Sequence, residues 1–122
     1  MKILVTGGAG FIGSHVTDNL LDKGHEVIVL DDLSTGTLVN LAAVRKKITF
    51  FQSRVEDFDF DHLDGLDSVI HLAAQASVPL SISDFYESSK TNILSSLKII
   101  DFCVRKKIPL VYASSSAIYG GL

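Results

Sequence analysis

A glycine-rich stretch that joins two different hydrophobic patterns is the strongest constraint on the fold of this chain. Residues 6–13 contain four glycines and follow an aliphatic run at residues 3–5, which is typical of a strand buried on both faces. Beyond them, Ile12, Val16 and Leu20 recur every four residues, as on one face of a helix. Glycines at such a junction permit a sharp turn, tight packing of helix on strand, and close approach of the backbone to an anion.

The rest of the 122-residue sequence repeats this alternation of strand and helix. The first strand, first helix and second strand form a βαβ unit, and Gly24 is placed to end that helix in a left-handed conformation. We expect strands at residues 3–5, 27–30, 48–51, 68–72 and 110–113, and helical segments at 11–23, 38–47, 58–66 and 83–107. This order predicts an α/β fold whose five strands form an open, doubly wound parallel sheet of the Rossmann type.

The glycine spacing predicts a dinucleotide site. It can be read as Gly8-x-Gly10-x-x-Gly13 or as Gly7-x-x-Gly10-x-x-Gly13, and it lies within the βαβ unit. Asp31 closes the second expected strand, where a carboxylate can accept hydrogen bonds from an adenosine ribose. A cluster of glycines that serves only helix packing is the alternative.

Two adjacent carboxylates bear on the choice of dinucleotide. Asp31 and Asp32 stand next to each other, and no arginine is close to them in the sequence. Because like charges repel, these carboxylates disfavour a 2′-phosphate, so NAD is expected as the cofactor rather than NADP. For Asp32, a plain turn role is the alternative.

Composition excludes several other kinds of protein. The formal net charge is −3, which argues against electrostatic capture of nucleic acid. A single cysteine, Cys103, excludes a disulfide framework and is expected to pack as a small core residue, and the four histidines are spaced unsuitably for a metal site. The sequence contains no apolar run of 18 residues and no secretory signal. We therefore expect no membrane span and a cytoplasmic protein.

Several further segments extend the pattern along the whole chain. Residues 6–15, 30–36, 71–78 and 113–120 together resemble the extended short-chain dehydrogenase/reductase family. More narrowly, the chain looks like the NAD-dependent nucleotide-sugar epimerases, of which UDP-glucose (UDP-galactose) 4-epimerase is the type.

The resemblance implies which residues contact NAD. Phe11 and Ile12 would give backbone N–H groups to the pyrophosphate, and Asp57 would accept from the exocyclic amine of adenine. Asn92 would contact the cofactor from the long helix, the alternative being a helix residue bonded to backbone. Ala76 stands where the family often has a lysine. The implied cofactor-binding residues are Gly7, Gly10, Phe11, Ile12, Gly13, Asp31, Asp32, Leu33, Ser34, Thr35, Gly36, Asp57, Phe58, Leu72, Ala73, Ala74 and Asn92.

The serines after the last expected strand bear on the reaction. Ser115 matches the family's catalytic serine or threonine, and a polar turn is the alternative. Related dehydratases carry Asp-Glu next, and related decarboxylases a glutamate, where this chain has Ser116-Ala117. Neither residue transfers a proton at neutral pH, so the resemblance implies epimerisation at C4 of a UDP-hexose through a 4-keto sugar. A dehydratase, a decarboxylase, a reductase and a stand-alone dinucleotide-binding module stay open.

The family's Tyr-x-x-x-Lys pair lies after its catalytic serine. Tyr86 and Lys90 have this spacing but precede the fifth expected strand, so we interpret them as a surface pair. We therefore expect residues 1–122 to be the truncated NAD-binding domain of a longer enzyme, with a later strand and the substrate domain absent. Such a chain is expected to be inactive by itself.

The resemblance also implies a homodimer through the helix at 83–107. Ile93, Leu97 and Ile100 form an apolar stripe on this helix, which can serve either dimer contact or packing against the sheet.

Overall fold

Parallel strands form the central layer of the computed structural model, which describes residues 1–74 and 78–121. The sheet has the order β3-β2-β1-β4-β5. All four neighbouring pairs are parallel, and Val5 lies opposite Val29 on one side and Ile70 on the other. The strands are β1 (Lys2–Thr6), β2 (Glu26–Asp31), β3 (Thr49–Gln52), β4 (Ser68–His71) and β5 (Leu110–Tyr112). The predicted doubly wound sheet is confirmed.

The first helix follows the prediction and the second does not. The helix α1 (Phe11–Asp22) ends just before Gly24, whose φ of +82° is the expected left-handed turn. The helix expected at 38–47 is wrong, because this segment forms only the 3₁₀ turns Leu38–Leu41 and Arg45–Lys47. Leu41 is the one buried residue of these two turns, so no apolar stripe holds a longer helix against the sheet.

The long helix at 83–107 is confirmed in its extent but is not uniform. It consists of α3 (Phe85–Ser89), a π-helical turn (Lys90–Leu94) and α4 (Ser95–Lys106), and α2 (Val78–Ser83) precedes it. The Asp84 carboxylate accepts from the backbone N–H of Glu87 and so caps α3, while Lys107 ends α4 at a φ of +56°. The remaining 3₁₀ turns are Val55–Asp57, Phe60–His62 and Ser116–Tyr119.

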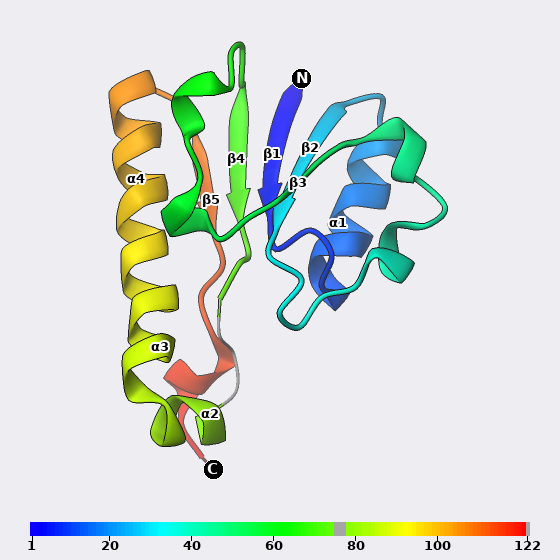
Figure 1. Ribbon diagram of the computed structural model, residues 1–122. Coiled ribbons are helices and arrows are strands. Elements are labelled where there is room, and N and C mark those ends of the chain that lie inside the picture. The colour runs from blue at the N-terminus through cyan, green and yellow to red at the C-terminus, as the bar shows by residue number, and fades with distance from the viewer. Residues whose placement is uncertain (75–77, 122) are drawn as a thin grey trace.

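Strand residues alternate between two cores, one on each face of the sheet. Ile3 and Val5 pack with the underside of α1, whereas Leu4 packs with α4. Figure 1 shows α1 and α4 on opposite sides of the strands. Both faces of β1 are therefore covered, as its unbroken aliphatic run predicted.

The two sides of α4 differ in character. Ile99, Phe102 and Cys103 are buried against the sheet, which confirms Cys103 as a core residue. The predicted stripe lies on the outer side, where Leu97 is 60% exposed and Ile93 is 57% exposed. The stripe therefore does not pack against the sheet of its own chain.

Candidate functional site

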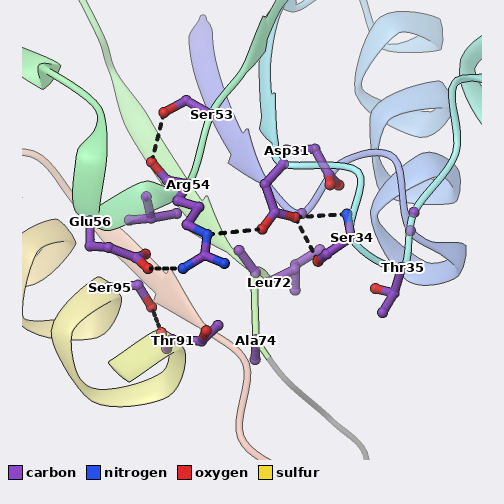
Figure 2. A pocket seen from close by; sticks show the side chains of 16 residues that line it. Asp31, Ser34, Thr35, Ser53, Arg54, Glu56, Leu72, Ala74, Thr91 and Ser95 are labelled. Carbon is purple, nitrogen blue, oxygen red and sulfur yellow. Dashed lines mark hydrogen bonds and ion pairs between the residues drawn. The ribbon is translucent and has the colours of Figure 1, made fainter. Parts of the chain in front are cut away.

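A pocket opens at the carboxyl ends of β1, β2, β3 and β4, where the strand order reverses between β1 and β4. Such a switch point is where open α/β sheets bind their ligands. The pocket is lined by Gly7, Gly10, Asp31, Asp32, Ser34, Thr35, Gly36, Ser53, Arg54, Val55, Glu56, Leu72, Ala73, Ala74, Thr91 and Ser95. Figure 2 shows the labelled members of this set converging from both halves of the sheet.

Three glycines in or beside the site are required by the fold itself. Gly7 has a φ of +73°, and a Cβ there would lie 2.7 Å from the backbone nitrogen of Ala73. A Cβ at Gly13 would lie 2.1 Å from the Gly7 carbonyl oxygen, and one at Gly36 would lie 2.8 Å from the Ala9 backbone. These glycines allow the glycine loop, α1 and the segment after β2 to pack backbone against backbone.

Gly10 differs from those three because no contact within the described residues requires it. A Cβ at Gly10 would meet only the Gly7 carbonyl oxygen, at an ordinary contact distance of 3.4 Å, and its backbone is extended. Gly10 nevertheless lines the pocket and immediately precedes α1, where no side chain caps the helix and no acidic residue occupies the first turn. The missing side chain therefore keeps the approach to free backbone N–H groups open, as an anion requires.

Asp31 is buried at the end of β2 and anchors two loops. One carboxylate oxygen accepts from the Ala9 backbone N–H at 2.9 Å, and the other accepts from the Leu33 N–H at 2.8 Å. Leu33 adopts a left-handed φ of +60° to make this contact. Because a carboxylate oxygen accepts more than one hydrogen bond, Asp31 retains acceptor capacity toward the pocket that it lines.

A buried hydrogen-bond hub joins β1 to β4 beneath the pocket. Thr6 Oγ1 accepts from the backbone N–H groups of Leu72 at 3.2 Å and Ala73 at 3.3 Å, and it lies 2.6 Å from Nδ1 of His71. Since both lone pairs of the hydroxyl are engaged, its proton is donated to Nδ1 and the imidazole proton is on Nε2. Burial lowers the pKa of His71 to about 4, so the ring is neutral at physiological pH.

One arginine reaches the pocket from a distant part of the sequence. Arg54 follows β3 and hydrogen-bonds to Glu87 of α3 at 3.2 Å, with Glu56 at 3.8 Å and Asp32 at 4.0 Å. These carboxylates, Glu87 foremost, raise the pKa of Arg54. Figure 2 shows Arg54 between Glu56 and the loop that carries Ser34. The sequence has no arginine close to Asp32, but the fold brings Arg54 to within 4.0 Å of it.

The structure brings together ten of the seventeen predicted cofactor residues, namely Gly7, Gly10, Asp31, Asp32, Ser34, Thr35, Gly36, Leu72, Ala73 and Ala74. Phe11, Ile12, Gly13 and Leu33 adjoin these residues without lining the pocket. Ala76, the position of the missing family lysine, lies outside the described residues.

Asp57 and Phe58 lie away from this pocket. Both line a separate depression with Phe60 and Lys98, and the Phe58 ring packs 5.0 Å from that of Phe60. The segment after β3 instead presents Ser53, Arg54, Val55 and Glu56 to the pocket. The rule that ligands gather at carboxyl ends of strands applies equally to β3 and could have found these residues.

The π-helical turn brings a further residue to the pocket. Thr91 lines it, as does Ser95 at the start of α4, whereas the predicted Asn92 is half-buried beside them and its carbonyl accepts from the Ser96 hydroxyl at 2.6 Å. π-Helical turns often occur at functional sites, yet the regular apolar spacing of this segment gave no signal of one.

Ser115 stands on the short link between β5 and the 3₁₀ turn at Ser116–Tyr119. It is exposed and does not line the pocket described above. Its predicted catalytic role stays a prediction. Within residues 1–74 and 78–121, no group of three or more His, Cys, Asp or Glu side chains could hold a metal ion, and every helix is too short or too polar to cross a bilayer.

Residues 3–122 match the model of a protein family described as the NAD dependent epimerase/dehydratase family. The chain is 39% identical over 127 residues to the UDP-glucose 4-epimerase of Lactobacillus helveticus, covering 98% of this chain and 37% of that protein. It is 36% identical over 126 residues to UDP-glucuronic acid decarboxylase 1 of Danio rerio, covering 98% and 28% respectively.

A solved structure shows the same fold. The UDP-glucose 4-epimerase of Thermus thermophilus, in complex with NAD, is 40% identical and matches with a TM-score of 0.84, over 94% of this chain and 38% of that one. The chain thus spans less than two fifths of the length of these relatives.

Proposed function

Because the chain belongs to the NAD dependent epimerase/dehydratase family, we propose that it forms the NAD-binding part of a nucleotide-sugar 4-epimerase. The complete enzyme would interconvert UDP-glucose and UDP-galactose through a 4-keto sugar. The observation that carries the proposal is the pocket in which Gly10, the start of α1 and the buried Asp31 meet at the switch point of the sheet.

The residues present fit NAD. Gly10 lacks a side chain although no described neighbour requires this, which is explained by a ligand that comes close to the backbone. The N–H groups of Phe11 and Ile12 would bind the pyrophosphate, and Asp31 would accept from the adenosine ribose. Leu72, Ala73 and Ala74 would run along the nicotinamide half. When bound, NAD supplies the hydride acceptor and donor of the reaction.

The chain's own contribution is to fix these groups in place. Asp31 holds the glycine loop and the segment after β2 through the N–H groups of Ala9 and Leu33. Thr6 holds the turn after β4 in the same way. Both anchors lie on central strands of the sheet, so the two halves of the site keep a fixed separation.

We propose Ser115 as the residue that would hydrogen-bond the sugar oxygen at the carboxyl end of β5. The names of both curated relatives contain a UDP-sugar, which supports a UDP-hexose substrate. One of these relatives is a decarboxylase, and that reaction is the second candidate. We favour epimerisation because Ser116 and Ala117 offer no group that transfers a proton at neutral pH.

We also propose a homodimer through the exposed stripe of Ile93, Leu97 and Ile100 on the outer side of the long helix. An unpartnered apolar stripe of this kind is typical of a helix that packs against another protein surface. A cytoplasmic location stays a prediction.

Two measurements test the proposed function. Calorimetric titration of the 122-residue chain with NAD should show one site per chain, and absence of binding would contradict a dinucleotide pocket. A protein that continues the chain to the length of its relatives should convert UDP-galactose to UDP-glucose. Release of CO₂ from UDP-glucuronic acid without that conversion would favour the decarboxylase, and NAD binding with neither product would favour a stand-alone binding module.

A further inference from the structure

Arg54 is the only basic side chain among the described residues that line the pocket. It shares this pocket with Asp31, the carboxylate proposed for the adenosine ribose, and with Ser34 and Thr35 of the following loop. In dinucleotide folds an acidic residue at this place accompanies NAD, whereas an arginine accommodates the 2′-phosphate of NADP. The pocket contains both residue types. Whether it prefers NAD or NADP therefore depends on whether Arg54 is free to bind a phosphate or is held by other groups.

Three carboxylates from separate places hold Arg54. Glu87 on α3 accepts a hydrogen bond from Nη1 at 3.2 Å, and Asp32 after β2 lies 4.0 Å from Nε. Glu56 lies 3.8 Å from Nη1, and its side chain is only 8% exposed. Three carboxylates contact one guanidinium, and Asp31 lines the same pocket. The electrostatic environment is therefore negative despite the arginine.

The buried carboxylate of Glu56 further stabilises the ion-paired position of Arg54. Its Oε1 atom is buried and has no hydrogen-bond partner within the described part of the chain. A buried carboxylate needs a nearby cation, since an uncompensated buried charge is strongly destabilising. Among the described residues, Arg54 is the cation that pairs with the Glu56 carboxylate, whereas Lys98 donates to the Glu56 backbone carbonyl. Movement of Arg54 toward an anionic ligand would break this ion pair.

We propose that Arg54 is a latent 2′-phosphate-binding residue, which Asp32, Glu56 and Glu87 hold in an ion-paired state that makes the pocket selective for NAD over NADP. This inference rests on the proposed NAD site. It predicts that removal of the three carboxylate charges frees the guanidinium to bind a phosphate through its charged N–H donors.

A matched pair of variants tests the proposal. The triple variant D32N/E56Q/E87Q removes the three charges and keeps side-chain size, and a quadruple variant adds R54Q to it. Combining R54Q with E56Q avoids a stranded buried carboxylate. A second quadruple variant adds K46Q instead, which changes net charge equally at an exposed lysine outside the pocket. Circular dichroism and thermal melting confirm that each variant is folded.

The quantity measured is the ratio of the Kd for NADP to the Kd for NAD, by calorimetry at fixed salt. We expect the wild-type ratio to be above about ten, to fall about tenfold in the triple variant, and to rise about tenfold again when R54Q is added. The variant with K46Q should keep the ratio of the triple variant. Equal ratios in the two quadruple variants, or a wild-type preference for NADP, would overturn the inference while leaving a dinucleotide site intact. A wild-type chain that binds neither dinucleotide would overturn the proposed function as well.

Discussion

The hydroxyl of Thr6 lies 2.6 Å from Nδ1 of His71, so a buried hydrogen bond joins the carboxyl ends of β1 and β4 directly beneath the candidate site. The same hydroxyl accepts from the N–H groups of Leu72 and Ala73. A side chain on β1 thus fixes the position of the backbone that follows β4, its neighbour in the sheet. The first two predictions follow from this pair.

Replacement of Thr6 by valine keeps the side-chain shape and removes the hydroxyl. The buried His71 Nδ1 and the half-buried Ala73 N–H would then lose their partner. We expect the free energy of unfolding to fall by about 2–4 kcal/mol. Urea unfolding followed by circular dichroism measures this. Thr6→Ser retains the hydroxyl and should lose clearly less, whereas equal losses in the two variants would show that packing, and not the hydrogen bond, matters.

His71 should make the stability of the chain depend on pH. Its pKa of about 4 in the folded state lies below the ordinary value of 6.5, so the unfolded chain binds more protons between these two values. The stabilisation is fully present above pH 6.5 and is lost as the pH falls toward 4, by about 3 kcal/mol in total. Urea unfolding at a series of pH values should show a shallower decline for His71→Gln than for wild type. His62→Gln, at an exposed histidine, should leave the decline unchanged.

Gly10 and Gly13 should separate ligand binding from folding. A Cβ at Gly13 would lie 2.1 Å from a backbone oxygen, whereas one at Gly10 meets only an ordinary contact. We expect Gly13→Ala to cost about 3 kcal/mol or more of stability, and Gly10→Ala about 1 kcal/mol or less. Gly10→Ala should nevertheless weaken NAD binding at least about tenfold, as measured by calorimetry. A Gly10→Ala variant with unchanged NAD affinity would sink the role proposed for this glycine.

The outer stripe of the long helix should be where two copies of the chain meet. Leu97 is 60% exposed, so Leu97→Glu should change the free energy of unfolding of the monomer by only about 0.5 kcal/mol. It should shift the equilibrium from dimer to monomer in sedimentation equilibrium, because a charge would be desolvated at the contact. Val39→Glu, at a 78% exposed residue on another surface, is the control and should leave the dimer intact. A wild-type chain that stays monomeric at high concentration would contradict the proposed homodimer.

Much of the fold follows from local patterns in the sequence. The hydrophobic runs predicted all five described strands. The signal is clearest in β1 and β2, because residues buried on both faces leave an unbroken hydrophobic run. The glycine loop and Asp31 predicted the pocket, because the turn and the free N–H groups depend on few residues that are close in sequence.

Arg54 illustrates what the sequence could not reveal. Its partners Asp32 and Glu87 are 22 and 33 residues away, and only the parallel pairing of β2 with β3 and the placement of α3 bring them together. Asp57 likewise does not line the pocket, whereas the residues just before it do. A shift of one residue along a segment turns a side chain to another side, which motif matching alone does not detect.

The position of β1 in the sheet has a consequence for the order in which the chain can fold. β1 lies between β2 and β4, and its partner residues in β4 come about 65 residues later. During synthesis, one edge of the first βαβ unit therefore stays unpaired until β4 has left the ribosome. Pairings that are distant in sequence form slowly, and unpaired strand edges invite association with other chains. Of β1, β2 and β3, the central strand β1 is thus the last to gain all its neighbours. The nascent chain is most exposed to misassembly before β4 emerges.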